Sequence, residues 1–288
     1  MGLDRGVIYV ATQGLRFLCE AMASADSVRR LLPDLSLTLF TDLVEPDRPL
    51  APFDIVRTFE LPPLPSVSPW ARGLYARVAT MRCSPYRRTV SLDTDTRVLR
   101  PEFARIFDEL EHHSFAAVPC TPERSCSCQW FGPMFNGGLI AFRRDPCTER
   151  LLGDWDALHR RHLAWMAADD CSQVPDLAHL GAERRQFYLG TNQPSLARLV
   201  APGRPNAYGM SVKELPEVFN AHGFRRAELH DGVIVDHHDR HKVADDRVSA
   251  FLEARGLSYL EDTPAGRPEP VIVRPGVVCD RWIAEEYR

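Results

Sequence analysis

The sequence predicts an α/β protein in which a mainly parallel central sheet is flanked by helices in a single domain. Short apolar runs rich in β-branched residues alternate with segments whose apolar residues recur every three or four positions. A strand, a helix and a second strand in this order predict parallel pairing through a right-handed crossover. The chain has 288 residues, of which 44% are hydrophobic and 26% charged, so it can bury a full core.

The N-terminal part of the chain predicts three strands and one helix. Residues 6–11 (GVIYVA) and 35–40 (LSLTLF) are apolar runs typical of buried strands, and residues 54–59 predict a third strand. Between the first two strands, apolar residues at helical spacing predict a helix over 15–32, which Pro33 ends. These elements predict one side of the parallel sheet with a covering helix.

The alternation continues after a proline-rich segment, which predicts a surface loop at residues 61–69. Pro101 and the pair Asp145-Pro146 are typical of helix starts. The remaining predicted elements are helices over 70–83, 102–111, 145–165 and from about 194, and strands over 88–92, 114–118, 139–143 and 232–235.

Charge and hydropathy exclude several kinds of partner. The formal net charge is −4 and the pI about 6.2, with acids and bases interspersed, so we expect no nucleic-acid partner. No run approaches the roughly 18 to 20 apolar residues that cross a bilayer, so we expect no transmembrane segment. The first residues lack the pattern of a secretory signal, and we therefore expect a cytoplasmic protein. The sequence leaves the oligomeric state open.

Asp93 and Asp95 follow an apolar strand in the run VSLDTD at residues 90–95. In an extended chain, residues i and i+2 point to one side about 6 to 7 Å apart, so both carboxylates can converge on one cation. Carboxylate oxygens suit Mg²⁺ or Mn²⁺, and α/β sheets bind ligands at the carboxyl ends of their strands. The pattern predicts a divalent-metal site, although D-x-D alone also occurs in turns and helix caps.

The residues around this motif resemble a known family. The run SPYRRTVSLDTD at residues 84–95 is similar to the "SPY…LDxD" segment of bacterial nucleotide-sugar glycosyltransferases related to family 8. Four further pieces follow the family's order: the opening strand and helix with Thr41-Asp42 after the second strand, FNGGLIAF at 135–142, TNQPSL at 191–196, and a late histidine within residues 236–238. The resemblance covers about residues 6–242. It implies a GT-A, Rossmann-like fold of the nucleotide-diphospho-sugar transferase superfamily.

The resemblance also implies roles for individual residues. The end of the first strand would hold base and ribose, Arg77 would lie near the diphosphate, and the turn at 136–138 would contact the sugar. The implied catalytic residues at the anomeric carbon are Gln193 and Asn192, together with Asp95. The implied nucleotide-sugar site comprises Val10, Ala11, Thr12, Arg77, Asp93, Thr94, Asn136, Gly137, Gly138 and Lys242, and the implied metal ligands are Asp93, Asp95 and His238.

Two segments depart from the family's pattern. Asn192 stands where the family usually has an aspartate, which puts the sugar preference of the family in doubt. The late glycine and lysine-proline-tryptophan of the family are replaced by DRHK at 239–242. His237 and His241 therefore rival His238 as the third ligand, and Arg240 or Lys242 is expected at the leaving diphosphate.

These assignments predict a metal-dependent glycosyltransferase. Mn²⁺ or Mg²⁺ would bridge the phosphates of a nucleoside diphosphate sugar, expected to be a UDP-sugar, and the family implies transfer with retention. The acceptor stays open between a saccharide, a natural product and a peptide. We expect the catalytic domain over residues 1–245 and a C-terminal extension over 246–288 packed on the same domain.

Two other classes of function compete with this prediction. The run VIVDHH at 233–238 also resembles the "DHH" signature of manganese phosphoesterases, although the early Asp-Gly-Asp motif of those enzymes is missing from the sequence. A nucleotide-sugar-binding protein without turnover is the second alternative, because Asn192 replaces a charged residue. Phosphate release from a phosphodiester would indicate the first, and tight binding without donor consumption the second.

Overall fold

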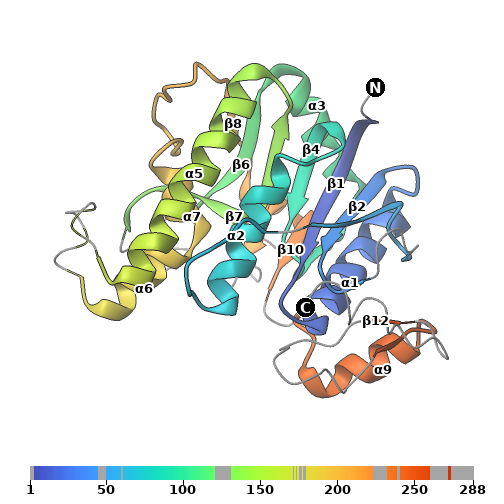
Figure 1. Cartoon of the computed structure of the whole chain (residues 1–288). Coiled ribbons are helices and arrows are strands. Elements are labelled where there is room, and N and C mark those ends of the chain that lie inside the picture. Colours follow the sequence, from blue (N-terminus) through green and yellow to red (C-terminus); the bar gives the residue numbers. More distant parts are fainter. Residues whose placement is uncertain are drawn as a thin grey trace.

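A seven-stranded sheet lies at the centre of the protein, with helices on both of its faces (Figure 1). The computed structural model describes residues 3–44, 50–59, 61–120, 131–170, 172, 174, 177, 180–222, 232–238, 241–259 and 272–273. The strand order is β3-β2-β1-β4-β7-β6-β8. The strands are β1 Leu3–Ala11, β2 Ser36–Thr41, β3 Ile55–Thr58, β4 Tyr86–Leu92, β6 Phe115–Cys120, β7 Met134–Arg143 and β8 Val212–Glu214.

Most strand pairs in this sheet are parallel. β3, β2, β1 and β4 pair in parallel in that order, and β6 pairs in parallel with β8. β7 runs antiparallel to both of its neighbours, β4 and β6. The predicted α/β fold with a mainly parallel sheet is therefore confirmed.

Side-chain alternation along the strands divides the core into two halves. Along β1, Val7, Tyr9 and Ala11 pack on one face of the sheet and Ile8 on the other. The first face is covered by α1 (Leu15–Leu31), α3 (Arg105–His112) and α9 (Val248–Glu253); the second is covered by α2 (Pro69–Met81), α5 (Pro146–Ala168) and α7 (Asn192–Ala197). Helices thus bury the sheet from both sides, as a mainly parallel sheet requires.

Two helices begin where the sequence predicts, because capping residues precede a proline. The Ser68 hydroxyl accepts a hydrogen bond from the Ala71 amide at 3.3 Å, and Pro69 opens α2. Asp145 accepts from the amide of Thr148 at 2.9 Å ahead of α5. The start of α2 matters for function, since this helix carries Arg77 to the predicted site.

The structure also contains elements that the periodicity does not predict. A second sheet has the strand order β5-β10-β9, formed by Thr96–Val98, Val235–His237 and Ala221–His222. Helix α6 (Ala182–Gly190) packs beside α5, and α7 begins at Asn192 rather than at about 194. β7 begins at Met134, so the segment predicted as a turn at 136–138 is part of a strand.

The C-terminal residues that the structure describes belong to the main core. Val248 and Leu252 of α9 pack in the same apolar cluster as β1 and α1, and Arg255 Nη2 lies 2.6 Å from Asp26 Oδ2 on α1. Of the extension predicted at 246–288, residues 260–271 and 274–288 lie outside the described part. The short remaining elements are β11 Ser258–Tyr259 paired with β12 Ile272–Val273, and the 3-10 turns Pro101–Ala104, Glu217–Phe219 and Asp245–Arg247.

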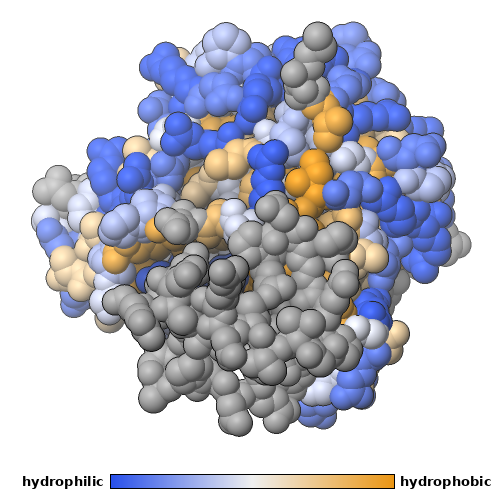
Figure 2. Space-filling model, turned by 45° about the vertical axis from the view of Figure 1, so that its right-hand side comes forward, coloured by the Kyte–Doolittle hydropathy of each residue, from blue (hydrophilic) through white to orange (hydrophobic). Residues whose placement is uncertain are grey.

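Among the described helices, none combines the length and apolarity needed to cross a bilayer. Figure 2 shows one face of the molecule, on which hydrophilic side chains surround apolar ones exposed near the centre.

Candidate functional site

The predicted carboxylates lie where the two sheets meet. β4 ends at Leu92, and the Asp93 amide donates to the Gly138 carbonyl of β7 at 2.9 Å. The chain then continues into β5, which pairs antiparallel with β10, so that His237 lies opposite Thr96. The antiparallel ladder therefore carries a residue from the late part of the chain to the end of β4.

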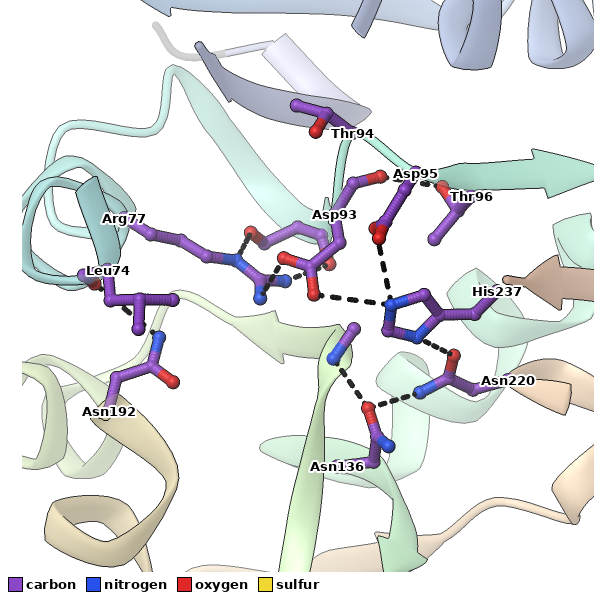
Figure 3. Close-up of polar contacts among 12 residues, drawn as sticks. Leu74, Arg77, Asp93, Thr94, Asp95, Thr96, Asn136, Asn192, Asn220 and His237 are labelled. Carbon is purple, nitrogen blue, oxygen red and sulfur yellow. Dashed lines mark hydrogen bonds and ion pairs between the residues drawn. The ribbon is translucent and has the colours of Figure 1, made fainter. Parts of the chain in front are cut away.

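Asp93, Asp95 and His237 form a cluster that could hold a metal ion. One ligand atom from each lies within 4.8 Å of the others. His237 Nε2 is 3.2 Å from Asp95 Oδ1 and 3.7 Å from Asp93 Oδ2 (Figure 3). Two carboxylate oxygens and one imidazole nitrogen suit Mn²⁺, so the residues present fit the predicted metal.

Among the described residues, the histidine of this cluster is His237 and not the predicted His238. Successive side chains of an extended chain point to opposite faces, so only one of His237, the last residue of β10, and His238 after it can face the carboxylates. His238 instead donates its backbone amide to the Asp95 carbonyl at 3.3 Å. The other rival, His241, places Nε2 2.9 Å from Asp236 Oδ2.

A chain of amides orients the His237 ring (Figure 3). Asn136 Oδ1 accepts from the Gly138 amide at 2.7 Å and from Asn220 Nδ2 at 2.8 Å. Asn220 therefore presents its Oδ1 to His237 Nδ1, at 3.0 Å. With a metal bound, the neutral ring would keep its proton on Nδ1, and the lone pair of Nε2 would point at the two aspartates. Histidines that bind metals usually donate their other ring N–H to an oxygen in this way.

Gly138 makes room for this ring. A Cβ atom at Gly138 would lie 2.2 Å from His237 Nδ1 and 3.0 Å from Asn220 Oδ1. The glycines at 137–138 were predicted to form a turn, but they lie within β7, where the missing side chains let other elements approach. At Gly137 a Cβ atom would lie 3.3 Å from Gln193 Cγ.

Arg77 is paired with Asp93 in the structure. It is 5% exposed, and its Nη1 lies 2.5 Å from Asp93 Oδ1. Nε and Nη2 donate to the hydroxyl and the carbonyl of Ser91, both at 3.2 Å. Arg77 therefore balances one carboxylate and fixes its rotamer, which is a different role from the diphosphate contact that the resemblance implies.

The electrostatics of the cluster separate its two carboxylates. Burial raises the pKa of Asp93 more than Arg77 and His237 lower it. Burial also acts on Asp95, but the hydrogen bond and the charge of His237, the charge of Lys242 and a backbone hydrogen bond together outweigh it and lower the pKa of Asp95 to about 2. Asp95 is thus a carboxylate at neutral pH, ready to accept a cation.

Asn192 and Gln193 lie at the start of α7, next to β7. Asn192 is 3% exposed; its Nδ2 donates to the Leu74 carbonyl at 3.5 Å, and its own carbonyl accepts from Trp155 Nε1 at 3.1 Å. Its amide thus joins α7 to α2 (Figure 3). Gln193 is partly exposed and lies against Gly137.

A cavity of about 800 Å³ opens in front of the two aspartates. Seven residues of the predicted site line it: Val10, Thr12, Arg77, Asp93, Thr94, Asp95 and Lys242. Ala11 does not, because its side chain is fully buried in the core. Arg240, the other candidate for the diphosphate, lies outside the described residues.

Glu20 is a site residue that the sequence analysis missed. It lines the cavity from α1 yet is only 2% exposed. Its Oε2 accepts from the Thr94 hydroxyl and its Oε1 from the Val243 amide, each at 3.0 Å. Glu20 thereby links two segments by hydrogen bonds: the segment next to Lys242, and the turn between the two aspartates. The sequence carries one indication of this role: Glu20 is an acidic residue among the mostly apolar residues of the predicted helix at 15–32.

Asp42, directly after β2, holds the turn that leads into α1. Gln13 has a φ of 66°, in the left-handed region, and its backbone amide donates to the Asp42 carboxylate. The other carboxylate oxygen, Oδ1, is buried without a partner among the described residues. Burial raises the pKa of Asp42 to about 6.

We expect Asp42→Asn to stabilise the protein at neutral pH but not in acid. The folded-state pKa exceeds the unfolded value, so the carboxylate costs stability progressively as pH rises from about 4 to 6. Because an amide carries no charge, the free energy of unfolding of the variant should exceed that of wild type by about 1 to 2 kcal/mol at pH 7.5. This difference should vanish near pH 4. Urea unfolding at both pH values, with exposed Asp34→Asn as control, measures it. An equal change at both pH values would contradict this assignment.

Similar proteins are found among solved structures. No protein-family model and no curated protein matches the chain. The galactosyltransferase LgtC, solved with donor and acceptor sugar analogues, is 14% identical, with a TM-score of 0.44 over 90% of this chain and 98% of its own. GlyE of Streptococcus pneumoniae TIGR4 is 15% identical, with a TM-score of 0.44 over 85% of this chain and 55% of its own. The bifunctional WbbM is 14% identical, with a TM-score of 0.48 over 82% and 46%. All three are described as glycosyltransferases, the class that the motifs of this sequence resemble.

Proposed function

We propose that this protein is a metal-dependent glycosyltransferase that moves a sugar from a nucleoside diphosphate sugar, of which a UDP-sugar is the first candidate, to an acceptor. One observation carries the proposal: the ligand atoms of Asp93, Asp95 and His237 lie within 4.8 Å of one another, and the two aspartates line a cavity of about 800 Å³. The cavity is large enough for a cofactor-sized ligand and contains convergent polar groups. The motif resemblance over residues 6–242 indicates the same chemistry.

The charges around the site suit a diphosphate held through a cation. Arg77 neutralises Asp93, and Lys242 lines the cavity close enough to lower the pKa of both Asp93 and Asp95. A divalent ion would add the positive charge that a diphosphate needs in a protein whose net charge is −4. When bound, such a metal supplies Lewis-acid stabilisation of the leaving diphosphate.

Residues of this chain would also contact the donor directly. Lys242, which lines the same cavity, would stabilise negative charge on the departing diphosphate. Gln193 lies beside Gly137, where a side-chain amide can hydrogen-bond a sugar. The resemblance supports transfer with retention.

The phosphoesterase alternative loses support from the same geometry. Its signature needs Asp236 and both following histidines near a metal centre. Asp236 is fully buried on β10 and holds His241, and only His237 faces the two aspartates. The binding protein without turnover remains the alternative to be separated by experiment.

We expect Mn²⁺-dependent thermal stabilisation by one nucleoside diphosphate, lost in Asp95→Asn. At about 100 times its dissociation constant, a specific ligand stabilises by about 2.7 kcal/mol. The variant keeps the size of the side chain but loses the charge, and metal-dependent affinity should fall by at least about 100-fold. UDP, GDP and ADP are compared with and without Mn²⁺ by differential scanning fluorimetry.

Asp108→Asn, on the exposed face of α3, is the matched control and should behave as wild type. Stabilisation by no nucleotide would sink the nucleotide-sugar proposal. Stabilisation without release of nucleoside diphosphate from any of a panel of donor sugars would favour the binding protein.

A further inference from the structure

Trp70 is a large apolar side chain that stays exposed inside the cavity. It is 48% exposed and lines the same cavity as Asp93 and Asp95. Trp70, Gly73, Leu74 and Arg77 recur at helical spacing and all line the cavity, so one face of α2 forms its wall. Arg77 marks the metal end, and Trp70 lies about 10 Å further along the helix axis.

The Trp70 ring packs against α6. Its centroid lies 5.8 Å from that of Phe187 on α6, with an interplanar angle of 31°. Gly190 at the end of α6 lets the ring approach, because a Cβ there would lie 2.9 Å from Trp70 Cζ3. A ring that is held by α6 and is still 48% exposed presents apolar surface that is already in place before binding.

The space in front of this ring is kept open. Among the described residues, a Cβ at Gly73 would have only Thr12 Oγ1 within 4 Å, at 3.8 Å, so there is room between this part of α2 and the end of β1. Gln13 lines the same end of the cavity, in the left-handed turn that Asp42 holds. Its side-chain amide carries both donors and acceptors. A flat apolar surface beside an amide suits a planar group with a polar edge.

We propose that Trp70 stacks on the base of the donor nucleotide and that Gln13 reads the polar edge of this base; this inference rests on the proposed glycosyltransferase function. A diphosphate held by Lys242 and by a metal at Asp93 and Asp95 leaves the Trp70 end of the cavity for the base. Stacking on an aromatic ring tolerates any base, so the side-chain amide of Gln13 would determine which base is preferred. The resemblance assigns the base only to residues 10–12, on the wall formed by β1.

The test compares a nucleotide with a ligand that lacks the base. Trp70→Ala should weaken Mn²⁺-dependent binding of UDP, GDP and ADP by about 10- to 100-fold, and leave binding of inorganic pyrophosphate with Mn²⁺ unchanged. Trp70→Phe should retain most of the nucleotide affinity but lose the quenching of tryptophan fluorescence by the nucleotide. Leu99→Ala, which removes another exposed apolar side chain away from the cavity, is the matched control.

The outcomes separate this inference from the function on which it rests. Equal weakening of nucleotide and pyrophosphate in Trp70→Ala would show that the side chain only supports α2 and Arg77, and would overturn the stacking role. Unchanged nucleotide affinity would overturn it as well. A wild-type protein that binds Mn²⁺ and pyrophosphate but no nucleoside diphosphate would overturn both proposals yet leave the metal site standing.

Discussion

Gly138→Ala should abolish metal binding at the aspartates while the protein remains folded. The added Cβ would lie 2.2 Å from Nδ1 and 2.4 Å from Cε1 of His237, so the ring must move away from its position beside the two aspartates. The steric cost is expected at about 1 to 3 kcal/mol, within what a domain of this size tolerates. Loss of a correctly oriented ligand should lower Mn²⁺ affinity by about 100-fold or more.

The neighbouring glycine supplies the matched control for this variant. At Gly137 an added Cβ would lie 3.3 Å from Gln193 Cγ, so this side chain must shift by a few tenths of an ångström, and 3.6 Å from Arg77 Nη1, which is an ordinary contact. Gly137→Ala should therefore bind Mn²⁺ as wild type does. Titration of Mn²⁺ by electron paramagnetic resonance gives the affinities, and urea unfolding gives the stabilities. Wild-type Mn²⁺ affinity in Gly138→Ala would remove His237 from the ligand set.

A second large effect is expected from two buried histidines on α5 as pH falls. His159 and His162 are fully buried. Burial lowers the pKa of His159 to about 3 and that of His162 to about 4. Their folded pKa values lie below the unfolded value of about 6.5, so the unfolded chain binds more protons in acid. The stability that the neutral rings contribute is complete above pH 6.5 and should fall by about 3 kcal/mol per histidine by pH 4.

His162→Phe isolates one of these contributions. Both ring nitrogens of His162 lack a partner among the described residues, and the ring packs 5.6 Å from Tyr188 and 5.4 Å from Trp165 between centroids. Phenylalanine keeps this packing and cannot be protonated. Its unfolding free energy should match or exceed wild type at pH 7 and depend less on pH between 6.5 and 4. A wild-type slope would contradict the assignment; exposed His112→Phe is the control.

Much of the fold could be predicted from local patterns. The strands from β1 to β4 are apolar runs, and Asp145-Pro146 marks the start of α5, so periodicity and capping were sufficient there. β5, β9 and β10 are two or three residues long and exist through pairing with one another. Such short strands leave no periodic signal, because tertiary contacts rather than their own composition stabilise them.

The residues of the site could likewise be predicted only where a local sequence pattern marks them. Asp93 and Asp95 could be chosen because both lie in one motif on one strand end. The choice between His237 and His238 depended on the register of β10 against β5, and a shift of one residue exchanges the faces. Asn220 could not be found, since nothing local marks it as the partner of His237.

Of the three residues proposed as metal ligands, His237 lies about 140 residues after the two aspartates in the sequence, which ties the site to folding. Asp93 and Asp95 follow an early strand, whereas His237 arrives through a separate small sheet that forms only by long-range pairing. A chain whose N-terminal half has folded alone would carry the two carboxylates but not the imidazole. On the proposed assignment, the protein would bind a metal with full affinity only once its whole fold has formed. Metal binding would then stabilise the late-formed segment against unfolding.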